Sequence, residues 1–172
     1  MTQLTFQPAL DPFHAMFRLI RLRHLFGGSG LEIDHARIID FYLLFPFRID
    51  ELRLSRAHQR FKRLSQKYSF LTPYGEQPDS SLLFQRMEPV QITALETLAA
   101  NSLLDPGALA VRMARSTDLA EPDELAKRIH ELNSAQSDLI EFLDRLARDY
   151  PLFGTDGLKS RSGLLEYRYD AI

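Results

Sequence analysis

The chain has 172 residues, of which 45% are hydrophobic, and a formal net charge of −2 at pH 7. This length and apolar fraction are enough for a core, so we expect a single domain over residues 1–172. The absence of cysteine excludes disulfides and thiol chemistry and is typical of a cytoplasmic protein. No apolar run is long enough to span a bilayer and the start lacks a signal-peptide pattern, so we expect neither.

The charges are unevenly distributed along the chain. Residues 1–70 hold 11 Lys/Arg against 6 Asp/Glu, whereas residues 71–172 hold 10 against 17. The net charges of the two parts are therefore +5 and −7. A basic N-terminal helical part can face nucleic acid or an acidic partner, although solvated helix faces explain the same counts. Both interpretations stay open.

The N-terminal segment predicts a short strand followed by a helix. Residues 2–7 alternate weakly, which is typical of an edge strand. Asp11 and Pro12 form an N-cap and first-position pair, and apolar residues then recur at helical spacing as far as Leu25. We expect the arginines of this helix to lie away from its apolar face. The glycine cluster at residues 27–30 lacks the strand and lysine of a phosphate loop, so we interpret it as a helix exit.

Residues 33–48 are the most apolar stretch and predict a central helix. Asp34 is the expected N-cap, and Pro46 ends the helix. Because this helix is apolar nearly all round, we expect it to lie in the middle of the core. A short corner then leads into a second helix predicted from Asp50 to about Tyr68.

This second helix carries two parallel stripes. One is apolar and begins at Leu54; the other is basic and is displaced by one residue, about 100° around the helix axis. No acidic residue follows Glu51 in the helix to neutralise the basic stripe. We expect the stripe to contact DNA or an acidic partner, the alternative being a solvated helix face. Its residues are Arg53, Arg56, Arg60, Arg63 and Lys67.

The second half of the chain predicts short helices and then a long one. In residues 80–114, Pro89 begins one helix and Asp105 caps another. Residues 122–150 form the longest helical pattern, with apolar side chains spaced alternately by four and three and one polar break. Such a seam packs within the chain or against a partner's helix, and both alternatives stay open. The seam consists of Leu125, Ile129, Leu132, Gln136, Leu139, Leu143, Leu146 and Tyr150.

Residues 157–170 form a strand-like tail in which apolar and charged residues alternate. The tail pairs either with residues 2–7 or with residues 157–161 in a small hairpin. In a winged-helix arrangement this hairpin is a wing that turns Lys159 and Arg161 towards a partner. The predicted fold is therefore mainly α, a helical domain with a winged-helix-like core and a short β-hairpin or edge strands formed by the termini.

The sequence contains no recognisable set of catalytic residues. Its five histidines are scattered without the spacing of metal ligands, and no Gly-x-Ser-x-Gly, His-Glu-x-x-His or Walker sequence occurs. We therefore expect no enzymatic activity from this chain alone, no metal and no cofactor.

Several segments, in their order and spacing, carry a family resemblance. They are residues 11–14, 17–22, 38–46, 73–74, 83–87, Gln91 and residues 157–170. Together they resemble the small middle components of bacterial ABC-three-component (ABC-3C) systems. This family includes the small third subunit of Lamassu anti-phage defence.

The resemblance implies a non-catalytic accessory or scaffold subunit. Such a subunit binds an SMC- or Rad50-like ATPase, and an effector, often a nuclease, joins the same complex, which senses foreign or broken DNA. Small partners of SMC-type ATPases often have winged-helix folds, with which the predicted helical corner and tail are compatible. An alternative of a different class is a stand-alone helix-turn-helix regulator whose second helix enters the major groove of DNA.

Overall fold

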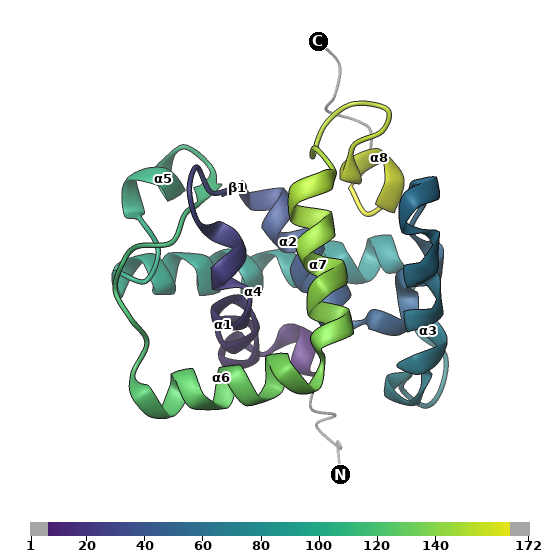
Figure 1. Cartoon of the computed structure of the whole chain (residues 1–172), viewed down its shortest axis with the longest axis horizontal. Helices are drawn as coiled ribbons and strands as arrows, with labels where there is room; N and C mark the ends of the chain where they lie inside the picture. The colour runs from purple at the N-terminus through teal and green to yellow at the C-terminus, as the bar shows by residue number, and fades with distance from the viewer. Residues whose placement is uncertain (1–6, 166–172) are drawn as a thin grey trace.

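The computed structural model describes residues 7–165 of the chain. As predicted, this part is mainly α-helical, with a single two-stranded sheet among the described residues (Figure 1). Its buried apolar side chains form one hydrophobic cluster. The strand predicted at residues 2–7, except Gln7, and the tail beyond residue 165 lie outside the described residues, so their pairing with each other stays a prediction.

Helix α2 (Ile33–Leu44) is the central helix, as predicted. Ten of its 12 residues are buried, and α7 (Ser137–Asp149) crosses it in Figure 1. The helix begins two residues earlier than predicted, with Glu32 rather than Asp34 at the N-cap. Asp34 therefore lies in the first turn, where its carboxylate accepts a hydrogen bond of 2.7 Å from Arg37 instead of capping the helix.

Helix α1 (Pro12–Arg21) begins at the predicted cap. The carboxylate of Asp11 accepts a hydrogen bond of 2.9 Å from the backbone N–H of His14. The helix packs along α4 (Ser80–Ala100) and continues into the short 3₁₀ helix η2 (Arg23–Phe26).

The buried face of α1 differs from the predicted one. Phe13, the first apolar residue of the predicted helical pattern, is exposed, whereas Leu19 and, directly after the helix, Leu22 are fully buried. Three arginines that we expected away from the apolar face are also buried, because carboxylate, amide and carbonyl oxygens inside the protein accept their N–H groups. These are Arg18, Arg21 and Arg23.

The glycine cluster leads into the small sheet. Strand β1 (Leu31–Glu32) pairs antiparallel with β2 (Met113–Ala114). Gly30 has a φ of +80°, and a Cβ at this position would lie 2.5 Å from the carbonyl oxygen of Ala114. Only glycine allows this approach, so the cluster has a backbone role here.

The prediction of short helices over residues 80–114 is wrong for the first part of that range. Helix α4 is continuous over 21 residues and contains Pro89 in its interior. The proline lies on the exposed side of the helix, where water can bind the carbonyl that loses its N–H partner. Helix α5 (Pro106–Ala110) does begin as predicted, with Asp105 accepting from two backbone N–H groups.

The single helix predicted from Asp50 to Tyr68 is also wrong. Its path is interrupted at Leu52, which has extended backbone angles, and the N–H of Arg53 donates to the carbonyl of Arg161 at 3.1 Å. Tertiary pairing thus replaces a helical hydrogen bond at this point. Most of the predicted apolar stripe is nevertheless buried. The segments are η3 (Pro46–Glu51), η4 (Arg56–Lys62), α3 (Arg63–Lys67) and η5 (Ser69–Leu71).

The long helix predicted over residues 122–150 is two helices. Helix α6 (Asp123–Ala135) runs along the lower edge of Figure 1, and α7 rises from its end. The break falls at Gln136, the polar position of the seam, where φ is −114° and ψ is 35°. The side-chain oxygen of Gln136 accepts a hydrogen bond of 2.7 Å from Arg21, which holds the corner in place.

The hairpin wing predicted with residues 157–161 is wrong, because these residues lie in and next to a helix. Helix α8 (Leu158–Ser162) has its first two N–H groups bound by the carbonyls of Pro151 and Leu152, at 2.8 and 3.1 Å. The side chain of Leu158 is fully buried. Burial and these bonds together stabilise a helical turn over the predicted strand.

Candidate functional site

The predicted basic stripe begins at Arg53, just before η4, and continues along a column formed by η4 and α3, at the right-hand edge of Figure 1. All five of its side chains are exposed. They do not share one face, however. Because η4 is a 3₁₀ helix with about three residues per turn, Arg56 and Arg60 lie on different sides of it.

Two cations of the stripe bind carboxylates of α7. Arg60 lies 2.7 Å from Glu141, and Lys67 forms an ion pair with Asp138. These pairs neutralise one side of the column from within the chain.

The other three cations differ from one another. Arg53 donates a hydrogen bond of 3.0 Å to the carbonyl of Thr155. Arg56 and Arg63 have no hydrogen-bond or ion-pair partner among residues 7–165. Of the five cations of the stripe, these two are therefore free of a partner in the described part of the chain, while Arg53 binds neutral oxygens only.

The contact between α3 and α7 centres on Asp138. Its partial burial by itself raises the pKa of the carboxyl group, but hydrogen bonds from Lys67, Tyr68 and the N–H of Leu139 outweigh this and hold the pKa below its usual value. The hydroxyl of Tyr68 donates to Asp138 at 2.8 Å, and burial together with this bond raises the pKa of Tyr68 to about 12. Near neutral pH, Asp138 is therefore ionised and accepts these hydrogen bonds, while Tyr68 is protonated and donates one.

A serine, a histidine and an aspartate meet where η4 approaches the end of α7. The Ser55 hydroxyl lies 3.2 Å from Nδ1 of His58, and Nε2 of His58 lies 3.2 Å from Asp149. The order resembles that of a catalytic triad. The hydroxyl of Tyr150, however, lies 2.8 Å from the same Nδ1 and 3.0 Å from the serine hydroxyl. The group therefore uses its hydrogen bonds to join η4 to α7, a contact that the sequence did not indicate.

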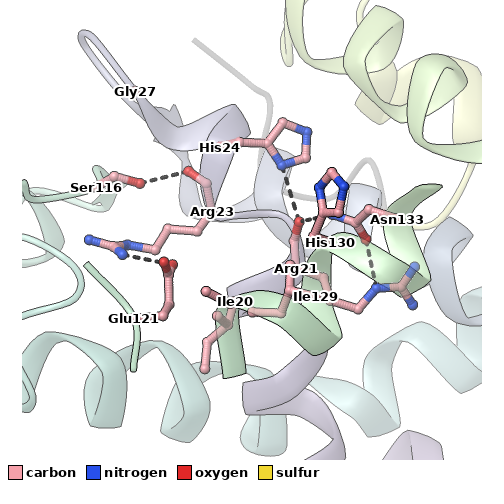
Figure 2. Close-up of a pocket in the computed structure, with 11 residues that line it drawn as sticks. Ile20, Arg21, Arg23, His24, Gly27, Ser116, Glu121, Ile129, His130 and Asn133 are labelled. Atoms are coloured by element: carbon pink, nitrogen blue, oxygen red, sulfur yellow. Dashed lines mark hydrogen bonds and ion pairs between the residues drawn. The ribbon is translucent and has the colours of Figure 1, made fainter. Parts of the chain in front are cut away.

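A groove of about 480 Å³ lies between α1, η2 and α6 (Figure 2). Ile20 and Ile129 contribute apolar surface to it. At the rim, Arg23 forms an ion pair of 2.7 Å with Glu121, and His130 adds a further polar side chain. The groove runs beneath one face of α6.

Polar contacts attach α6 to the rest of the protein. Arg21 donates to Asn133 at 2.9 Å and to Gln136, and the amide group of Asn133 donates back to the Arg21 carbonyl at 3.0 Å (Figure 2). Burial lowers the pKa of Arg21. Arg128 of α6 also stacks over Phe17, with 5.2 Å between the guanidinium and the ring centre. None of the α6 residues is buried.

The predicted seam is consequently divided between two environments. In the α7 half the alternative of packing within the chain holds, because Leu139, Leu143, Leu146 and Tyr150 are buried in the core. In the α6 half Leu125, Ile129 and Leu132 are half-buried. The alternative of packing against a partner's helix stays a prediction for that half.

The two cations assigned to the wing lie on α8 instead. The guanidinium of Arg161 donates to the carbonyl of Arg53 at 2.9 Å and pairs with Asp156 at 3.0 Å. Its interactions are thus with its own chain, contrary to the predicted orientation towards a partner. Nζ of Lys159 lies 5.9 Å from the ring centre of Phe153.

A buried ionic network joins α1, α2 and α4, and sequence reasoning missed it. Arg18 binds the fully buried Asp40 through two hydrogen bonds of 2.6 and 3.0 Å. Gln91 donates to Asp40 at 2.8 Å and accepts from Arg37 at 3.0 Å. The available signal was Asp40 itself, because one carboxylate in an otherwise apolar helix requires a buried partner. The sequence did not indicate which arginine provides it.

Two further properties concern residues 7–165 alone. No group of three His, Cys, Asp or Glu side chains there is arranged to hold a metal ion. None of the helices in this range combines the length and the apolar character needed to cross a membrane.

These features define a mainly α-helical protein with an exposed basic column and a peripheral helix, α6. The family model of the ABC-three component (ABC-3C) system Middle Component 5 matches residues 4–170, and the chain belongs to this family. The resemblance seen in the sequence is confirmed at the level of the family, which makes the chain a component of a multi-subunit ABC-3C system. Comparison with curated proteins gave no match, and neither did comparison with solved structures.

Proposed function

We propose that this chain is a non-catalytic scaffold subunit of a cytoplasmic anti-phage defence complex of the Lamassu kind. In this proposal it links an SMC- or Rad50-like ATPase to an effector, a nuclease, and helps the complex to sense foreign or broken DNA. Membership of the middle-component family supports the assignment to a multi-subunit system.

The observation that best supports the scaffold role is the partial exposure of the apolar side chains of α6. This helix has 13 residues and an apolar seam, yet none of its residues is buried. A helix attached mainly by polar contacts over an open groove has apolar surface left for a second protein. The partner contact predicted for the seam therefore concerns Leu125, Ile129 and Leu132.

The alternative of a stand-alone helix-turn-helix regulator loses its main support. It requires a continuous recognition helix over residues 50–68, and this segment is interrupted at Leu52 and largely 3₁₀. Only two cations of the predicted stripe, Arg56 and Arg63, remain without a partner in the described part of the chain.

Co-expression with the proteins encoded beside it tests the proposal. A tagged chain is purified with its neighbours, and the complex is sized and identified by mass spectrometry. We expect co-elution with a large ATPase, and the paired substitution Leu125→Ser with Ile129→Ser should weaken it. A control pair on an exposed face, Glu124→Gln with Glu131→Gln, should leave it intact. Elution as a lone monomer or homodimer beside an abundant co-expressed ATPase would contradict the scaffold role.

A further inference from the structure

Helices α1 and α6 together present apolar side chains around one arginine. The guanidinium of Arg128 on α6 lies 5.2 Å from the ring centre of Phe17 on α1, so the two helices are in contact at this point. Phe13 lies one turn before Phe17 on the same face of α1 and is 74% exposed. Leu125 and Leu132, three residues before and four after Arg128, share its face of α6 and are half-buried. We call these five residues the α1–α6 surface.

Arg128 differs from the other arginines that stack on aromatic rings within residues 7–165. Each of the others also forms an ion pair with a carboxylate, at 2.7 to 3.7 Å. Arg128 has its ring but no carboxylate partner in this range. The four arginines that have both are Arg37, Arg48, Arg60 and Arg161.

The acidic residues of α6 itself do not supply the carboxylate that Arg128 lacks. Glu124 and Glu131 lie four residues before and three after Arg128, a spacing that permits ion pairs within a helix. The guanidinium lies over Phe17 of α1 instead. Because the N–H groups of a guanidinium lie in its own plane, stacking on a ring leaves them available to an acceptor. A carboxylate from another molecule can therefore bind Arg128 at the edge of Phe17.

We infer that the α1–α6 surface binds an amphipathic segment of a partner subunit that carries an Asp or Glu on its apolar side. The carboxylate pairs with Arg128, and the apolar side chains around it pack on Phe13, Phe17 and the two leucines. The inference rests on the proposed function and adds to it the chemistry of the partner at α6. Arginine is enriched among the residues that dominate binding energy, and apolar contacts around such a residue exclude water from it.

Nucleic acid fits the same surface less well. On α6 the two basic side chains, Lys127 and Arg128, are outnumbered by Asp123, Glu124 and Glu131, which repel a phosphate backbone. The inferred segment is therefore a protein one, and nucleic acid is the competing result of the test.

Site-specific photo-cross-linking in the co-expressed complex tests the inference. Benzoylphenylalanine replaces Phe13 in one variant and, as a matched position, Phe70 of η5 in a second, because this ring is 76% exposed. We expect Phe13→benzoylphenylalanine to cross-link to a partner peptide that contains an Asp or Glu among apolar residues, and the Phe70 position not to cross-link to that peptide. Adding Arg128→Glu should lower the yield at Phe13 about tenfold at limiting partner concentration.

A neighbouring residue provides the control for total charge. Lys127→Glu makes the same change in net charge one residue earlier, about 100° around the axis of α6, and should leave the Phe13 cross-link unchanged. Reversing the acidic residue of the cross-linked partner peptide to lysine should lower the yield as much as Arg128→Glu does, with this chain unaltered. Combining the two reversals should restore the yield, which a purely structural role of Arg128 within α6 would not do.

The outcomes separate the inference from the function on which it rests. An intact complex in which the Phe13 position gives no cross-link, or in which neither charge reversal changes the yield, overturns the inference and leaves the scaffold role in place. An adduct removed by nuclease overturns it in favour of nucleic acid. Absence of any complex refutes the proposed function, and the inference fails with it.

Discussion

Helices α6 and α7 are consecutive and of equal length, but they are held by different kinds of contact. Helix α7 packs on α2, which is apolar nearly all round, and four of its own residues are buried. Helix α6 lies beside α1 and is held by Arg21, which donates to Asn133 and Gln136. Equal apolar spacing thus leads to burial only where the neighbouring helix offers an apolar surface.

The difference gives the two helices separate roles in our account. Helix α7 completes the core and, through Asp138 and Glu141, fixes the basic column. Helix α6 keeps half-exposed apolar side chains above an open groove. The apolar side chains of α7 are therefore already covered within the chain, whereas those of α6 leave apolar surface to which another protein can bind.

The largest effect should come from disrupting the buried ionic network of α1 and α2, the helices against which α6 and α7 pack. Asp40→Ala leaves Arg18 without its carboxylate in the core, so we expect the free energy of unfolding to fall by about 3–5 kcal/mol. Urea unfolding followed by circular dichroism measures this loss. Glu96→Ala, on the exposed side of α4, is the control and should change stability by less than about 0.5 kcal/mol. Equal stability of the two variants would refute the role of the network.

Identical leucine truncations sharpen the comparison between α6 and α7. Leu143→Ala opens a cavity in the core, and we expect a loss of about 2–5 kcal/mol in the free energy of unfolding. Leu125→Ala removes a half-buried side chain from α6 and should cost less than about 1 kcal/mol. Similar losses in the two variants would mean that α6 is packed as firmly as α7.

Removing the arginine at the corner should loosen α6 alone. Arg21→Met preserves the length of the side chain but removes its hydrogen bonds to Asn133 and Gln136, and we expect a cost of about 1–3 kcal/mol. Hydrogen exchange should become faster in α6 and stay slow in α7. Arg148→Met, on the exposed side of α7, is the matched control. Faster exchange in α7 as well would show that the two helices unfold as one unit.

The smallest effect is on the stability of the protein at acidic pH. Because the pKa of Asp138 is lowered in the folded state, its contribution is present above the unfolded pKa of about 4 and is lost as the pH falls through the folded value. Asp138→Asn should therefore reduce the loss of stability on the acid side, measured by unfolding at a series of pH values. Asp144→Asn, which removes an exposed ion pair within α7, should change this slope less. An unchanged acid slope in Asp138→Asn would contradict the role of this carboxylate.

Local signals in the sequence predicted the parts of the fold that depend on a few neighbouring residues. The caps at Asp11 and Asp105 are present, and the apolar run around α2 forms the central helix. Such features depend on backbone hydrogen bonds and burial within one turn, which the sequence displays directly.

Features set by distant partners could not be predicted in this way. The pattern before Tyr68 favours a helix, yet the N–H of Arg53 pairs with a carbonyl 108 positions away. The arginines of α1 resemble surface charges until their partners on α2 and α6 are known. The same holds for the basic stripe, because only the position of α7 decides that Arg60 is neutralised and Arg56 is free.

Hydrogen exchange of the free chain and of the assembled complex tests the central claim most directly. In the free chain we expect slow exchange in α7 and fast exchange in α6. On assembly, exchange in α6 should slow by about tenfold or more as a partner covers its apolar side, while exchange in α7 stays unchanged. Equal protection of the two helices in the free chain, or no change in α6 on assembly, would contradict the claim that α7 belongs to the core and α6 to a partner surface.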